Sequence, residues 1–133
     1  MDEPLPPHVV VINDERDILA LFRELLEDEG YRVSTLTYPV AELADLQIMA
    51  PDLIVLDMLF GGEDRGWQFL QQLRLNRATA ALPVIICTAA IRLVREAHDY
   101  LTNMGIGVNL KPFDIDPFLD EVRRRLAQDR GAN

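Results

Sequence analysis

The sequence predicts an α/β protein: a doubly wound sheet of five parallel strands accompanied by five helices. Short apolar runs rich in β-branched residues alternate along the chain with amphipathic stretches at helical spacing. The apolar runs are hydrophobic at successive positions, as strands are when helices cover both faces of a parallel sheet. Strands that alternate with helices in this way are connected by right-handed crossovers.

Five segments have the composition of strands. They are residues 9–12, 31–36, 53–57, 84–87 and 108–110. The segment 31–36 is more polar than the others, which is typical of an edge strand. The segment 53–57 is apolar until its last residue, Asp57, and is the strongest candidate for a central strand.

Helical periodicity fills the intervals between these strands. The predicted helices are residues 15–29, 39–49, 67–76, 91–104 and a last one that begins near residue 114. The side chains expected to face the core are Ile18, Phe22, Leu25 and Leu26; Val40, Leu43 and Leu46; Leu70 and Leu73; Ile91, Val94, Ala97, Leu101 and Met104; and Ile115, Leu119, Val122 and Leu126. Gly30 is expected to end the first helix in the C′ position.

The composition limits the function classes. A chain of 133 residues is long enough for one domain with a core of its own, and the sequence contains no linker or second domain. The net charge of −9 argues against nucleic acid or an anionic membrane as a direct partner. The single cysteine, Cys87, excludes an internal disulfide and is expected in the core. Without a membrane-spanning or signal segment, a cytoplasmic protein is expected.

Polar residues follow four of the predicted strands. Asn13 and Asp14 follow the first, Asp57 ends the third, Thr88 follows the fourth and Lys111 follows the last. Ligands of such sheets bind at the carboxyl ends of the strands. Each residue alone could be a turn or helix-capping residue, but their convergence on one edge favours a site.

This set of side chains suits phosphoryl transfer. Two neighbouring carboxylates, Asp14 and Asp57, repel each other unless a cation such as Mg²⁺ lies between them. The ammonium group of Lys111 can match the charge of a phosphoryl group, and the Thr88 hydroxyl can bond one of its oxygens. Phosphoryl transfer depends on positioning and charge neutralisation, so no histidine is required.

The sequence resembles the receiver domain of bacterial two-component response regulators. Residues 10–18, 51–57, 86–89 and 110–113 resemble the family's acidic-pocket, phosphoacceptor, switch-hydroxyl and lysine segments. The resemblance covers residues 8–128, so residues 1–7 are expected to be a disordered tail and residues 129–133 a second tail. It implies a flavodoxin-like sheet with strand order 2-1-3-4-5.

The resemblance also implies a role for each site residue. Asp57 would be the phosphorylated aspartate, Thr88 the hydroxyl that senses the phosphoryl group, and Lys111 the counter-cation. Asp14 and Asp57 would bind Mg²⁺ directly, together with the backbone carbonyl of Leu59, while Asn13 would act through a water molecule. A histidine kinase or phosphotransfer protein would donate the phosphoryl group, and a further protein would receive the signal.

The sequence departs from the family pattern at three places. Asn13 stands where an acid is usual, which removes a negative charge from the metal pocket. Gly61 and Gly62 occupy a loop that usually contains proline. Val108 replaces the usual aromatic switch residue, so the loop after Thr88 is expected to carry the output.

Three other functions compete with a phosphoacceptor. A pseudo-receiver, which binds partners without being phosphorylated, is favoured by Asn13 and Val108. It is opposed by the presence of the four other site residues, Asp14, Asp57, Thr88 and Lys111. An aspartate-dependent phosphatase would need a second acid two residues after Asp57. A nucleotide-binding Rossmann domain would need a glycine-rich turn after the first strand, and the sequence has none.

Overall fold

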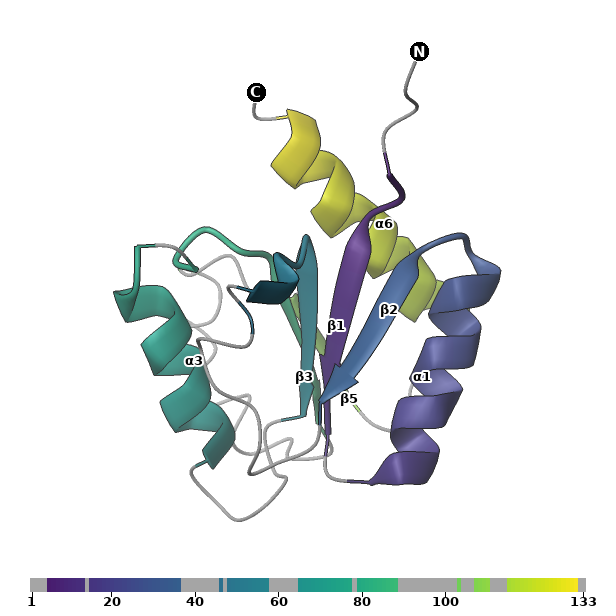
Figure 1. The fold of residues 1–133 in the computed structure, drawn as a ribbon, viewed down its shortest axis with the longest axis horizontal. Helices are drawn as coiled ribbons and strands as arrows, with labels where there is room; N and C mark the ends of the chain where they lie inside the picture. The colour runs from purple at the N-terminus through teal and green to yellow at the C-terminus, as the bar shows by residue number, and fades with distance from the viewer. Residues whose placement is uncertain are drawn as a thin grey trace.

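The computed structural model of the chain describes residues 5–13, 15–36, 46, 48–57, 65–77, 79–88, 103, 107–110 and 115–131. Figure 1 shows the alternation of strands and helices along the chain. The strands are β1 (His8–Ile12), β2 (Arg32–Leu36), β3 (Leu53–Asp57), β4 (Val84–Thr88) and β5 (Gly107–Leu110). The helices are α1 (Arg16–Asp28), α3 (Arg65–Leu75) and α6 (Ile115–Gly131).

The strands form one parallel sheet in the order β2-β1-β3-β4-β5. β3 lies between β1 and β4, and β2 lies at one edge, as the sequence predicts. The pairing is in register from strand to strand: Val10 lies opposite Ile54, and Val55 lies opposite Ile85. The predicted α/β fold class and strand order are therefore confirmed.

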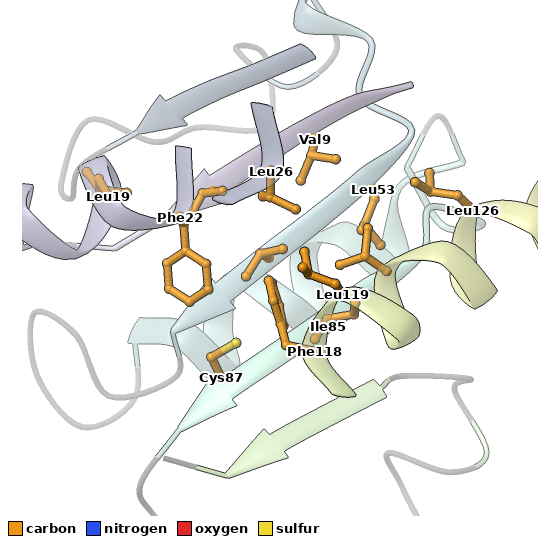
Figure 2. Close-up of a cluster of buried hydrophobic side chains, with 13 residues drawn as sticks. Val9, Leu19, Phe22, Leu26, Leu53, Ile85, Cys87, Phe118, Leu119 and Leu126 are labelled. Atoms are coloured by element: carbon orange, nitrogen blue, oxygen red, sulfur yellow. The ribbon is translucent and has the colours of Figure 1, made fainter. Parts of the chain in front are cut away.

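The sheet is covered on both faces, and alternate residues of β1 show this. Val9 and Val11 belong to one buried cluster, with side chains of α1 and α6 (Figure 2). Val10 and Ile12 belong to the other, with side chains of α3 and with Leu46. Because side chains alternate across a strand, a strand that is hydrophobic at every position must be covered on both faces.

The end of α1 confirms the prediction for Gly30. Its φ of 93° lies in the left-handed region, which glycine adopts without steric cost. The Gly30 N–H donates to the Glu27 carbonyl at 2.9 Å, and the Tyr31 N–H donates to the Leu26 carbonyl at 3.2 Å. These two bonds are those of a Schellman motif, and they satisfy carbonyl groups that the helix itself leaves unpaired.

The buried face of α1 differs partly from the prediction. Phe22 and Leu26 are buried as expected, but the third fully buried residue is Leu19. Ile18 and Leu25 are only half-buried. The helix is rotated so that the line from Leu19 to Leu26 faces the sheet, which periodicity alone did not settle.

The start of α6 also corrects the prediction. Ile115 was expected in the core, but it is 48% exposed. Phe118 is buried instead, with Leu119, Val122 and Leu126 as predicted. Phe118 lies edge-on to Phe22 of α1, with ring centroids 5.2 Å apart. An aromatic pair therefore joins the two helices that share this face of the sheet.

Several predicted segments lie partly or mostly outside the described residues. The helices predicted at residues 39–49 and 91–104 lie mostly outside them; in the first, Leu46 is helical and buried. α6 continues to Gly131, past the expected boundary at residue 128. Arg32 donates to the carbonyls of Pro6 and Pro7, both at 2.9 Å. The domain limits 1–7, 8–128 and 129–133 stay predictions.

A buried histidine links the amino-terminal ends of three neighbouring strands. The His8 ring contacts the Met49 carbonyl at 3.0 Å through Nδ1 and the Ser34 hydroxyl at 2.7 Å through Nε2. Its backbone N–H donates to the Asp52 carboxylate at 2.8 Å. Because a carbonyl only accepts, Nδ1 must carry a proton in this arrangement. His8 therefore joins β1 to β2 and to the start of β3, at the end of the strands opposite to Asp57.

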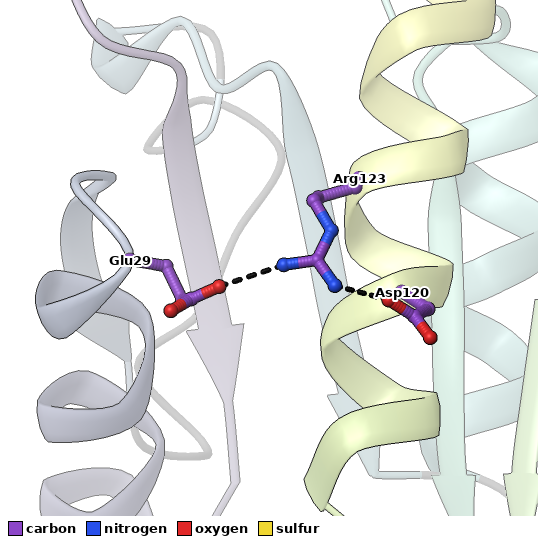
Figure 3. Close-up of polar contacts among 3 residues, drawn as sticks. All are labelled: Glu29, Asp120 and Arg123. Carbon is purple, nitrogen blue, oxygen red and sulfur yellow. Dashed lines mark hydrogen bonds and ion pairs between the residues drawn. The ribbon is translucent and has the colours of Figure 1, made fainter.

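An ion-pair group connects the end of α1 to α6. Arg123 bonds the Glu29 carboxylate at 2.7 Å and also the carboxylate of Asp120 (Figure 3). The charges of Arg123 and Glu29 also act on the pKa of the nearby Tyr31 phenol. Burial raises this pKa, the positive charge of Arg123 lowers it, and the negative charge of Glu29 raises it further.

The raised pKa of Tyr31 predicts a loss of stability at alkaline pH. The folded protein favours the neutral phenol, whereas in the unfolded chain the phenol ionises near the ordinary pKa of 10.0. Stability from this group is fully present below that pH and is lost as the pH rises through the folded-state pKa. Urea unfolding of the wild type and of Tyr31→Phe across this range checks it. The free energy of unfolding should fall less steeply in the variant, and parallel pH profiles would contradict the prediction.

Candidate functional site

The register of the sheet brings the predicted strand ends to one edge. Ile12 lies opposite Leu56, so Asn13 and Asp57 follow at the same level on adjacent strands. On the other side of β3, Asp57 lies opposite Cys87. Thr88 is the next residue of β4 and ends that strand. The backbone thus places three of the predicted site positions together around the end of β3.

Three predicted site residues lie outside the described residues: Asp14, Leu59 and Lys111. The neighbours of two of them are placed. Asp14 is between Asn13 and Glu15, and Lys111 follows Leu110, the last residue of β5, which lies opposite Thr88. The roles assigned to all these residues stay predictions.

Asn13 has a structural contact that the sequence interpretation missed. Its side chain is buried, and its Oδ1 accepts the Glu15 N–H at 2.9 Å. Its backbone N–H donates to the Leu36 carbonyl at 3.2 Å. An asparagine oxygen that bonds the N–H two residues later forms an Asx turn.

The Asx turn supports the start of α1. Glu15 is the N-cap residue of this helix, and its own side chain forms no capping bond. Asn13 therefore satisfies a backbone donor just ahead of the helix. The signal for this role was available in the sequence as an asparagine two residues before a predicted helix start.

The donor atoms at this edge are compatible with a hard cation. Asn13 supplies an amide oxygen and Asp57 a carboxylate, and Mg²⁺ prefers oxygen ligands and retains several waters. A carboxamide oxygen has two lone pairs, so its bond to Glu15 does not exclude contact with a metal-bound water. Among the described residues, no three His, Cys, Asp or Glu side chains are grouped as a metal site would require. Asp14, the second predicted carboxylate ligand, is not among those residues.

Apolar side chains lie beneath this edge. Ile12, Leu56 and Cys87, which precede the three site positions on their strands, are all buried. Cys87 is buried in the cluster with α1 and α6, which confirms its predicted place in the core. Polar interactions next to such a buried apolar layer, where the dielectric constant is low, are stronger than in water.

The family model of the response regulator receiver domain matches residues 9–123. The chain belongs to this family. Receiver domains are signalling domains of two-component systems, and phosphorylation and Mg²⁺ are general features of the family. The resemblance in the sequence is thereby confirmed.

The chain is also similar to a transcriptional regulator and to a sporulation phosphotransferase. The receiver domain is 32% identical over 127 residues to the DNA-binding dual master transcriptional regulator RpaA of Synechocystis, covering 90% of this chain and 49% of that protein. It is 25% identical to sporulation initiation phosphotransferase F of Bacillus subtilis, covering 89% of this chain and 92% of that protein. The chain thus spans about half the length of the first of these relatives.

A solved structure shows the same fold. The chemotaxis response regulator CheY4 of Vibrio cholerae has a TM-score of 0.76 at 23% identity, covering 90% of this chain and 98% of that one. This is the flavodoxin-like arrangement that the sequence predicts. In the described part of the receiver domain, no helix has both the length and the apolar content to cross a membrane.

Proposed function

We propose that this receiver domain is a phosphoacceptor switch in which Asp57 accepts a phosphoryl group. The observation that carries the proposal is the place of Asp57: it ends β3, the strand that lies between β1 and β4. Asn13 lies at its level on one side, and Thr88 follows its partner Cys87 on the other. A histidine kinase or a phosphotransfer protein is the donor, and the protein acts in the cytoplasm.

The reaction is a displacement at phosphorus. A carboxylate oxygen of Asp57 forms the new P–O bond while the P–N bond of a phosphohistidine breaks, and the imidazole nitrogen keeps the electron pair. The product is an acyl phosphate on Asp57. The domain assists this transfer, and later loss of the phosphoryl group to water, by positioning rather than by acid–base chemistry.

Six positions support this reaction in the proposal. Asp14, Asp57 and the Leu59 carbonyl hold Mg²⁺, and Asn13 bonds a metal-bound water. When bound, the ion neutralises charge between the aspartate and the incoming phosphoryl group. Lys111 pairs with the phosphoryl charge, and Thr88 bonds one of its oxygens.

The switch follows from the new charge at the strand edge. Phosphorylation biases an equilibrium between two arrangements of nearby segments. Thr88 ends β4, so a pull on its hydroxyl acts directly on the segment that follows. The changed surface then binds a downstream protein.

Phosphotransfer from a small acyl-phosphate donor tests the proposal. We expect an acid-stable, base-labile adduct that forms with Mg²⁺ and not after its removal by a chelator. As a control for damage by the chelator, Mg²⁺ is added back in excess over the chelator, and the labelling should return. An adduct that forms equally well without a divalent cation would contradict the proposed metal role.

Asn13→Asp is expected to strengthen Mg²⁺ binding. The variant oxygen can still accept the Glu15 N–H, so the Asx turn is kept and only the charge changes. An added carboxylate near a divalent cation is worth on the order of 1–4 kcal/mol, and we expect an affinity about tenfold higher by calorimetric titration. Asn13→Ser, which keeps a neutral oxygen, is the control. Equal affinity of Asn13→Asp and wild type would show that the missing charge does not limit binding.

A pseudo-receiver is the second candidate function. The observation that favours it is the commitment of the Asn13 side chain to the turn before α1. In that case the fold presents a constant binding surface, and neither a small donor nor a kinase labels Asp57. The labelling experiment therefore separates the two functions.

A further inference from the structure

Two of the five residues of β2 direct their backbone groups outward. The Arg32 N–H donates to the Pro7 carbonyl, and the Leu36 carbonyl accepts from Asn13. In a parallel ladder, residues that bond one neighbour alternate with residues that face away from it. Arg32, Ser34 and Leu36 therefore face β1.

The residues between them, Val33 and Thr35, direct their N–H and C=O groups to the outer edge of β2. No other strand of the described sheet pairs with this edge. Among the described residues, Arg23 Nη2 makes a weak contact there, 3.4 Å from the Val33 carbonyl on the exposed surface. The edge thus offers a short row of donors and acceptors to an incoming strand.

An open groove of about 570 Å³ runs beside this edge. Thr35 lines it on the side of β2, and Arg16, Ala20 and Glu27 are among the α1 residues that line the other side. Figure 1 shows that β2 and α1 are neighbours at this end of the sheet. A strand added to β2 would place alternate side chains in this groove, because side chains alternate between the two faces of a strand.

The charge of the groove favours a basic occupant at one end. Three acids, Glu24, Glu27 and Asp28, line the part near the carboxyl terminus of α1. Of the two arginines that also line the groove, Arg23 donates to the Val33 carbonyl, and Arg16 begins the helix at its other end. The last turn of this helix has no basic residue, although the partial negative charge of a helix end favours cations. A second copy of the chain, with its net charge of −9, would be repelled.

We propose that an extended, lysine- or arginine-rich segment of a partner protein adds to β2 as a further strand. Its backbone bonds the outward groups of Val33 and Thr35 and displaces Arg23 from the Val33 carbonyl. Its basic side chains lie beside Glu24 and Glu27. This mode of recognition takes affinity from backbone bonds and specificity from alternate side chains. It does not depend on phosphorylation of Asp57.

A short synthetic peptide in which valine alternates with lysine is the probe. Amide hydrogen exchange, resolved by NMR, reads out each residue of β2 separately. We expect the exchange of Val33 and Thr35 to slow about tenfold at saturating peptide, because their N–H groups gain partners. Ser34 and Leu36 already bond β1, so they serve as internal controls and should change little.

Charge and backbone variants complete the test. The double variant Glu24→Gln with Glu27→Gln should weaken peptide binding about tenfold, whereas Asp116→Asn, an exposed acid on α6, should leave it unchanged. Thr35→Pro removes one outward N–H without removing a bond to β1, and should abolish the protection of Val33.

Three results would overturn the proposal. They are the absence of binding, binding that leaves Val33 and Thr35 unprotected, and equal protection by a peptide in which valine alternates with glutamate. The second would mean that the peptide associates with acidic surface elsewhere. Protection of these two amides with weakened binding of the charge variant would support it even if Thr35→Pro failed to fold.

Discussion

Asp57→Asn is expected to abolish formation of the acyl phosphate. The amide of asparagine is a poor nucleophile toward phosphorus, and the substitution also removes a charge from the predicted metal pocket. The wild type and the variant are to be incubated with the same acyl-phosphate donor and Mg²⁺. Intact protein mass before and after alkaline treatment measures the base-labile adduct, which should fall to background in the variant.

A matched control lies at the other end of the same strand segment. Asp52 precedes β3, and its carboxylate accepts the His8 N–H. Asp52→Asn keeps an oxygen that can accept this bond, so labelling should persist. Undiminished labelling of Asp57→Asn would place the phosphoacceptor elsewhere, and loss of labelling in both variants would point to a general defect of folding.

Phe118→Ala is expected to cause a large loss of stability. The side chain is fully buried and pairs with Phe22 across the contact between α6 and α1. Truncation of a buried phenylalanine costs about 3–5 kcal/mol, through lost burial and the cavity left behind. The midpoint of urea unfolding should therefore shift far downward, with little change in the slope of the transition.

Ile115→Ala is the comparison that tests the position of α6. This residue begins the same helix but is half exposed, so the expected cost is below about 1 kcal/mol. The sequence interpretation placed Ile115 in the core and would predict the larger loss there. Equal destabilisation by the two variants would contradict the position of α6 in this structure.

The strands were predictable because their signal is local. Each apolar run, such as residues 53–57, is bounded by polar or turn-forming residues within a few positions. Which side of each helix is buried against the sheet was less predictable. Ile18 and Ile115 were expected in the core, but Leu19 and Phe118 are buried instead. Apolar residues at neighbouring positions allow more than one rotation of a helix about its axis, so periodicity alone does not select the buried face.

The candidate site divides in a similar way. The residue types at the strand ends indicated phosphoryl chemistry, and the family match supports that reading. The contact of Asn13 with Glu15 was not foreseen, although it is local, because the residue was considered only as a metal ligand. Asp14, Leu59 and Lys111 lie outside the described residues, so their part of the site stays a prediction from the sequence.

The sequence by itself determined the fold class, the family and the order in which Asp57, Thr88 and Lys111 come at the ends of their strands. These properties depend on residue types and spacings along the chain. The tertiary structure decided which strand ends lie at one level, which face of α6 is buried and which groups of β2 face outward. Such features depend on hydrogen bonds and packing between segments far apart in sequence, as His8 shows by joining Ser34, Met49 and Asp52. A local pattern fixes the partners of none of these groups, because each partner is supplied by another segment.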